Sequence, residues 1–173
     1  RRRFKDTDYV FVVNDRREYG QYVGQHGKVM ENGLPSEAVV SLARPGGFVY
    51  DLVESRPVLA QMQGDKLTWT ADLGPCDGRV YMISSRAIED VRVAVPEKVE
   101  RGGSVKCVVE VVDAEGLPID AVLPLEVNVR DAEGRLAEFS GYYAAVDGRV
   151  EIALDIAPND PPGIWQIAAR ELA

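Results

Sequence analysis

The chain has 173 residues, of which 46% are hydrophobic and 28% charged, so wholesale disorder and fibrous repeats are excluded. The formal net charge of -8 argues against a nucleic-acid partner, because such binding needs a basic surface. One His and two Cys leave few ligands for a metal, and we expect neither a metal site nor a cofactor.

The start of the chain indicates a piece of a longer polypeptide, because it reads Arg-Arg-Arg-Phe and lacks an initiator Met. The next four residues are Lys-Asp-Thr-Asp, so no signal peptide is indicated. No apolar run reaches the roughly 18 residues of a membrane span, and no membrane insertion is expected. The cellular compartment stays open, with an exported or cell-surface parent protein as one option.

Short runs of β-branched and aromatic residues, separated by Gly, Pro, Asp and Asn, predict an all-β protein. Gly64-Asp65 has the chemistry of a tight hairpin turn. In the first half of the chain we expect strands at 9–13, 37–43, 48–53, 57–61, 67–73 and 79–83.

Residues 14–36 are predicted to form a long loop, because they match neither a helical nor a strand pattern. The segment holds four Gly, two Tyr and the only His. Loops of this length in compact domains usually have a function, or they are ordered and pack against the domain surface.

A second group of strands follows, with turns every 8–12 residues, which is typical of a β-sandwich. Two of the turns carry the same Asp-Ala-Glu-Gly sequence, and a third is Val146-Asp147-Gly148. The expected strands are 91–96, 104–112, 122–130, 136–144, 149–156 and 164–170. The predicted organisation is therefore two consecutive antiparallel β-sandwich domains, 1–88 and 89–173, the second immunoglobulin-like.

The two cysteines are expected to be free thiols. Cys76 lies in a Gly-Pro-Cys-Asp-Gly turn and Cys107 in an apolar alternating run. Because they fall in different predicted domains, their Cα atoms are not expected within the about 7 Å that a disulfide requires.

The predicted loop contains the best candidate for ligand binding. Tyrosine rings can stack on sugar faces, while Gln and His side chains can bond hydroxyls. The candidate residues are Tyr19, Gln21, Tyr22, Gln25 and His26. Under the alternative interpretation, the two Tyr rings pack against the sandwich and anchor the loop there, while the glycines allow it to turn.

Catalytic interpretations find less support in the sequence. His26 has no nucleophile motif to activate, and no carboxylate pair stands out as a glycosidase dyad. The acidic residues near Asp6 and Asp160 lack the spacing of a calcium loop. Trp69 and Trp165 lie among apolar neighbours in predicted strands and are expected to pack in the core.

Residues 48–84 carry a family resemblance. They read Val-Tyr-Asp-Leu-Val, then a hairpin, then Leu-Gly-Pro-Cys-Asp-Gly-Arg-Val. This order resembles the β-sandwich accessory domain that closes many bacterial glycoside hydrolases after the catalytic barrel. The resemblance implies a non-catalytic domain.

The second group resembles an immunoglobulin-like domain of the macroglobulin or bacterial-adhesin type. The matching residues are Arg101 to Val105, Val111 to Pro118, Asp147-Gly148 and Pro162 to Ile167. Such domains serve as spacers or binding modules, so the resemblance transfers no catalytic residue.

Together these features predict a non-enzymatic accessory or scaffold fragment of a larger bacterial protein, carbohydrate-active or surface-located. Its partners would be neighbouring domains of the parent chain. One alternative is a glycan-binding module, which requires exposed tyrosines on one flat or concave surface. Another is an assembly module with an open sheet edge, expected at 9–13 or 91–95.

Overall fold

The computed structural model describes residues 1–173 and consists of strands joined by turns and loops, without a helix. Its sheets are antiparallel, which confirms the expected all-β class. No helix of the length and hydropathy needed to cross a membrane is present.

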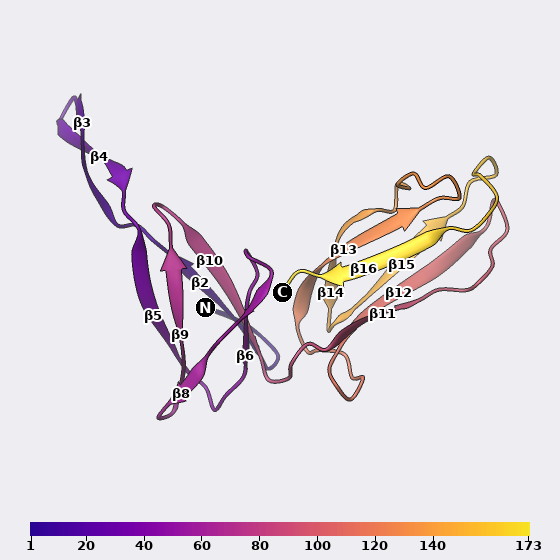
Figure 1. Ribbon diagram of the computed structural model, residues 1–173, viewed down its shortest axis with the longest axis horizontal. Coiled ribbons are helices and arrows are strands. Elements are labelled where there is room, and N and C mark those ends of the chain that lie inside the picture. Colours follow the sequence, from indigo (N-terminus) through magenta and orange to yellow (C-terminus); the bar gives the residue numbers. More distant parts are fainter. The chain divides into compact units, whose positions relative to one another are not determined.

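The chain divides into two compact units, which are described separately (Figure 1). The first comprises residues 1–3 and 8–85, and the second comprises residues 86–173 together with the N-terminal turn 4–7. Thr7 Oγ1 donates to the carbonyl of Asp120 at 2.7 Å, and Lys5 Nζ lies 2.6 Å from Asp147 Oδ1. These two contacts fasten the N-terminal turn to the second unit.

Two sheets form the body of the first unit. The larger has the strand order β1-β2-β10-β6-β7, and the smaller has the order β5-β9-β8. The strands are β1 (Arg2–Phe4), β2 (Thr7–Val13), β5 (Ser36–Ala43), β6 (Phe48–Asp51), β7 (Arg56–Val58), β8 (Gln61–Gln63), β9 (Lys66–Leu73) and β10 (Gly78–Ser84). The hairpin turn at Gly64-Asp65 is confirmed, and the predicted strand 57–61 is divided between β7 and β8.

The core of the first unit is shared by its two sheets. Trp69 of β9 packs edge-on against Tyr81 of β10, with ring centroids 5.4 Å apart. Both residues are buried, so the expected core position of Trp69 is confirmed. The buried cluster consists of Leu42, Val49, Leu67, Trp69, Ala71, Tyr81 and Ile83.

The second unit is one six-stranded sheet with the order β11-β12-β15-β14-β13-β16. β14 and β15 pair only through Val146 and Arg149, next to their connecting turn, so the sheet folds there into two layers. Alternate residues of β12 and β13 are buried between the layers, as expected for strands that cover one core. The strands are β11 (Asp90–Ala94), β12 (Ser104–Val112), β13 (Val122–Arg130), β14 (Gly141–Val146), β15 (Arg149–Asp155) and β16 (Gln166–Glu171).

Two strand predictions in this unit are corrected. The strand expected at 136–144 begins at Gly141, because Ser140 Oγ bonds the backbone N–H and C=O of Val129 in place of a sheet ladder. The strand expected at 164–170 begins at Gln166. Trp165 lies before it, only partly buried, and its Nε1 donates to the carbonyl of Pro161 at 3.2 Å.

The segment 14–36, expected to be a long loop, is a β-hairpin, and the loop prediction is wrong. β3 (Arg17–Gly24) pairs with β4 (Gly27–Gly33) as a separate two-stranded sheet, called the arm below (Figure 1). The register shifts twice, between Glu18 and Tyr19 and between Tyr19 and Val23. These bulges break the regular alternation by which a strand is recognised in a sequence.

Candidate functional site

The arm is anchored at its base by Asn14, which is buried. Its Nδ2 donates to the carbonyls of Leu34 and Gly74, both at 2.7 Å, and its Oδ1 accepts the amide of Arg16 at 3.1 Å. Its own amide donates to the carbonyl of Asp77 at 2.8 Å. Asn14 thus ties both ends of the arm to the turn that precedes β10.

The turn at the base is itself stabilised by Asp77. Its carboxylate accepts the amides of Gly74 at 3.2 Å and Gly78 at 2.7 Å. These two backbone hydrogen bonds, with the nearby Arg79, lower the pKa of Asp77 below its ordinary value. The Asp77 carboxylate is therefore ionised at neutral pH and holds the turn in place.

One face of the arm carries Tyr19, Val23, Lys28 and Met30. Tyr19 stands directly opposite Met30, and Val23 directly opposite Lys28. Directly opposed residues of an antiparallel pair project to the same face, and residues two apart on β4 share a face. All four side chains are exposed.

The opposite face carries Tyr22, Val29 and Glu31. A Cβ atom at Gly20 would meet the Glu31 side chain, and one at Gly24 would lie 3.2 Å from Val29 Cγ2 and 3.8 Å from the Tyr22 ring. The Glu31 carboxylate also accepts the amide of Tyr22 at 3.4 Å. Tyr19 and Tyr22 therefore project to opposite faces of the arm.

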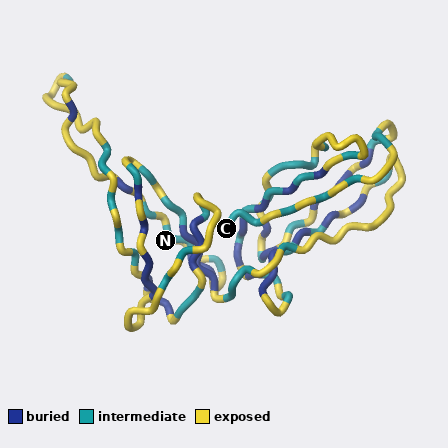
Figure 2. The backbone as a smooth tube through the Cα atoms, in the orientation of Figure 1, coloured by how far each residue is buried: buried dark blue, intermediate teal, exposed yellow.

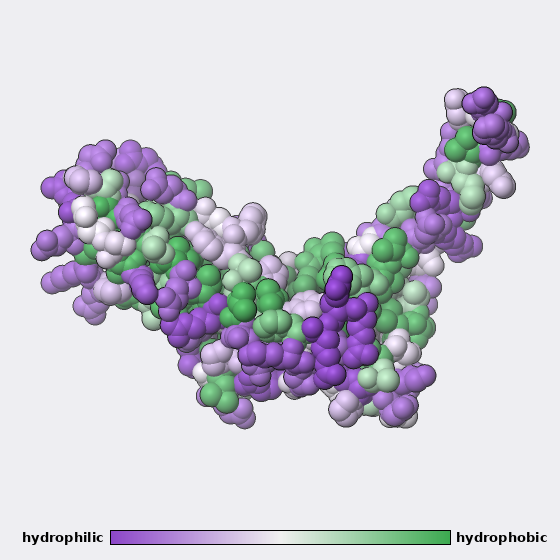
Figure 3. Space-filling view, turned by 180° about the vertical axis from the view of Figure 1, so that it is seen from behind, coloured by the Kyte–Doolittle hydropathy of each residue, from purple (hydrophilic) through white to green (hydrophobic).

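Both faces of the arm carry apolar side chains that are open to solvent. The exposed fractions are 65% for Tyr19, 63% for Tyr22 and 64% for Val23, and Val29 and Met30 are exposed as well. In Figure 2 the arm is drawn almost entirely as exposed, and in Figure 3 its surface mixes hydrophobic with hydrophilic residues. The interpretation that the two Tyr rings plug this segment onto the sheets is therefore wrong.

The five candidate residues from the sequence all lie on the arm but do not converge. Gln25 and His26 form its terminal turn, and both are exposed, as is Gln21. Because the two tyrosines face opposite ways, these residues make no single flat or concave surface. Sequence reasoning missed Val23, Val29 and Met30, although the apolar residues on either side of Gly-Gln-His-Gly are a hairpin signal.

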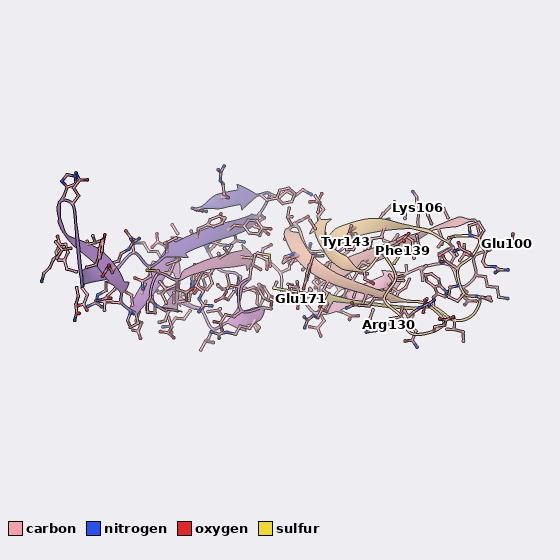
Figure 4. The ribbon with its side chains drawn as sticks, turned by 90° about the horizontal axis from the view of Figure 1, so that it is seen from above. Glu100, Lys106, Arg130, Phe139, Tyr143 and Glu171 are labelled. Carbon is pink, nitrogen blue, oxygen red and sulfur yellow. The ribbon has the colours of Figure 1, made fainter.

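The second unit gathers no comparable cluster of functional groups. Glu171 is half-buried, and burial raises its pKa, but it lies at a distance from other labelled charges such as Glu100 and Arg130 (Figure 4). Cys107 is a buried free thiol whose pKa is raised by burial, and Cys76 is free and exposed. No group of three His, Cys, Asp or Glu side chains is arranged to hold a metal ion.

The sequence matches no protein-family model, and no curated protein is similar to it.

Proposed function

We propose that this chain is a non-catalytic accessory part of a larger bacterial protein, and that its arm docks onto a neighbouring domain of the same polypeptide. The observation that carries the proposal is that both faces of the arm expose apolar side chains, Tyr19, Val23 and Met30 on one and Tyr22 and Val29 on the other. A glycan platform would instead need aromatic rings on one side.

A two-stranded hairpin without a covering layer is marginally stable in water. The arm buries almost no side chain of its own, because β4 is exposed from Gly27 to Asn32. A protein partner that covers both faces would bury five large apolar side chains. Each such burial contributes about 1.5–3 kcal/mol, before the loss of mobility on docking is subtracted.

The two family resemblances support the accessory role. The residues that resemble a glycoside-hydrolase accessory domain form β6 to β10 of the first unit. The two-layer antiparallel arrangement of the second unit supports the resemblance to an immunoglobulin-like spacer. Both resemblances concern scaffolds, so a docked neighbour is the partner we propose first.

Photo-crosslinking from the arm tests the proposal. A benzoylphenylalanine is placed at Tyr19 or at Tyr22 in the complete natural polypeptide, and the crosslinked peptides are mapped by mass spectrometry. We expect both positions to crosslink within the same chain, to peptides outside residues 1–173, because each face meets the neighbouring domain.

Tyr142 provides the matched control, because it is 78% exposed and lies on β14 of the second unit. Benzoylphenylalanine at position 142 should give no crosslink to the peptides that crosslink to positions 19 and 22. Absence of crosslinks from both arm positions, or crosslinks confined to residues 1–173 or to other chains, would contradict the proposal.

Strand addition at an open sheet edge is a second candidate function. β5 has eight residues and pairs only with β9, so one side of it is free for a partner strand. Of the two edges expected from the sequence, residues 90–94 do form the end strand β11. The expectation for 9–13 holds only in part, because β2 lies between β10 and β1, and β1 has three residues against seven in β2.

A further inference from the structure

The free edge of β5 differs from every other strand edge in the chain. β5 is eight residues long, lies at the end of its sheet and pairs with β9 over its whole length without a bulge (Figure 1). It carries one charge, at Glu37, and no proline. Natural proteins protect an edge of this length with charges, proline or bulges, because its unpaired N–H and C=O groups otherwise recruit another strand.

The other edge strands carry such protection. β1, β7 and β8 have three residues each. β11, β16 and both strands of the arm hold two charged residues each. β5 is therefore the edge best suited to accept a strand, and the partner inferred below rests on the second candidate function, strand addition at β5.

The hairpin of β8 and β9 determines which backbone groups of β5 are free. Gly64 has φ +63° at the first position of a two-residue turn, as in type II′ geometry. In such a hairpin Lys66 bonds back to β8, so the next residue, Leu67, bonds to Leu42 of β5, and this alternation continues along the pair. The even-numbered residues of β5 therefore bond to β9. The N–H and C=O groups that point toward the free edge belong to odd-numbered residues, among them Glu37, Val39 and Ser41.

This free edge is complementary to itself under a two-fold rotation. A second β5 lying antiparallel must place odd-numbered residues opposite odd-numbered ones, because only these offer free donors and acceptors. An alignment about Val39 meets this condition. Val39 then lies opposite Val39 of the second copy, and Glu37 lies opposite Ser41 on both sides of the axis. All three free residues of each copy exchange hydrogen bonds with the other copy.

The side chains agree with the same alignment. Val39 is 68% exposed, and opposite its own copy it makes an apolar contact at the two-fold axis. The Ser41 hydroxyl can donate to the Glu37 carboxylate opposite. The two Glu37 residues lie four positions apart along the pair, about 14 Å, which exceeds the screening length of about 8 Å at physiological salt. On the core side Ala38 lies opposite Val40 of the second copy, and both are half-buried, so the pair extends the core.

We propose that two copies of this chain join through β5 as an antiparallel, two-fold symmetric pair. The two β5-β9-β8 sheets then form one continuous sheet. A two-fold contact uses the same surface on both copies and closes after two, so no β5 edge is left for further growth. A single strand pair is a small interface, and we expect a dissociation constant of about 10–100 µM.

Charge substitutions at Val39 test both the partner and the alignment. Sedimentation equilibrium of the 173-residue chain between about 1 µM and 1 mM should show a reversible dimer. Val39→Lys and Val39→Glu each place two like charges directly opposite one another, so each variant alone should dimerise about tenfold more weakly or worse. An equal mixture of the two variants should form the mixed dimer about tenfold more tightly than either variant pairs with itself, because Lys then faces Glu.

Val13→Lys is the matched control. Val13 is 74% exposed on β2, in the other sheet of the same unit, and its replacement should leave dimerisation unchanged. Because Val13 and Val39 are both exposed, all variants should unfold at the same urea concentration as the unmodified chain when they are monomeric.

Hydrogen exchange gives an independent measurement of the alignment. The amides of residues 37, 39 and 41 should exchange more slowly as the protein concentration rises, because they become bonded to the second copy. The amides of residues 38 and 40 should be protected at every concentration, because they are bonded to β9 within the chain.

Three results would overturn the self-pairing of β5. They are a monomer at about 1 mM, a dimer that neither Val39 variant weakens, and no preference for the mixed dimer. Protection of amides 37, 39 and 41 in a complete natural polypeptide that is monomeric would also overturn it, while leaving addition of a different strand in place. The docking of the arm is tested separately by the crosslinks from Tyr19 and Tyr22.

Discussion

The Asn14 side chain attaches the arm to the first unit, so replacing this side chain tests the observed fold most directly. In Asn14→Ala the hydrogen bonds from Nδ2 to Leu34 and Gly74 are lost, together with the bond from the amide of Arg16 to Oδ1. The hydrogen bond from the backbone amide of residue 14 to the carbonyl of Asp77 remains, so the first end of the arm is still attached to the turn before β10.

The expected destabilisation follows from the three lost bonds. Each hydrogen bond contributes about 0.5–1.5 kcal/mol net, and a buried carbonyl left without a partner adds to the loss. We therefore expect the free energy of unfolding of the first unit to fall by about 3 kcal/mol. Hydrogen exchange should also become faster at the arm amides than in β9 or β10, because the base of the arm opens first.

Urea unfolding measured by the fluorescence of Trp69 provides the assay. Trp165 is replaced by Phe in every protein, so the signal comes from the first unit alone. Asn32→Ala is the matched control, since Asn32 is exposed on β4 and its side chain makes no hydrogen bond. A loss below about 1 kcal/mol for Asn14→Ala, or a loss equal to that of the control, would refute the assigned role of Asn14.

Two further expectations concern turns. Gly148→Ala should destabilise the second unit by more than about 2 kcal/mol, because φ is +68° and the new Cβ would lie 2.7 Å from the backbone of Ile119. Gly134→Ala, at φ +80° in open space, should lose only about 1 kcal/mol in the same urea measurement, and equal losses would contradict the steric argument. The hydrogen bond from the Gly74 amide lowers the pKa of Asp77 in the folded chain. The ionised Asp77 carboxylate therefore contributes its full stability above the ordinary pKa of 3.8, and this contribution is lost as the pH falls through the lowered pKa. Urea midpoints of the first unit between pH 7 and pH 3 should fall less in Asp77→Asn than in the unmodified chain, and identical pH dependences would contradict this.

The regular strands could be predicted from the sequence because their burial follows a simple alternation. β12 and β13 begin and end at the predicted residues, 104–112 and 122–130. In both strands nearly every second residue is buried and apolar, and an Asp-Ala-Glu-Gly turn follows each. Local pattern and tertiary environment therefore indicate the same structure in these strands.

The arm could not be recognised in this way, because it has no core side. Two register shifts disturb the alternation in β3, and its apolar residues are as exposed as its polar ones. A strand pattern identifies the face that is buried within the same chain. A hairpin with both faces exposed has no buried face and therefore no such alternation, so sequence analysis assigns it as a loop.

The first unit also has an open pocket of about 300 Å³, which sequence reasoning could not find for a different reason. Its polar groups come from β6, β7, β9 and β10, and each of them has an ordinary structural interpretation when read alone. Asp51, for example, accepts the amides of Val53 and Glu54 as a turn residue would. Only the packing of the two sheets brings Asp51, Asp72 and Arg79 to the same opening.

The turn 74–77 contacts both the base of the arm and Arg79, which lines the pocket. Its carbonyls at Gly74 and Asp77 accept the hydrogen bonds of Asn14, which fix the base of the arm. Asp77 Oδ2 lies 3.2 Å from Arg79 Nη2, and this ion pair helps to fix the guanidinium that lines the pocket. Cys76 lies in this turn at φ +55°, and a Cβ atom at Gly33 would lie 2.7 Å from its sulfur, so a larger residue at 33 would force the turn and the arm apart. One ordered turn therefore helps to position both the base of the arm and the guanidinium of Arg79.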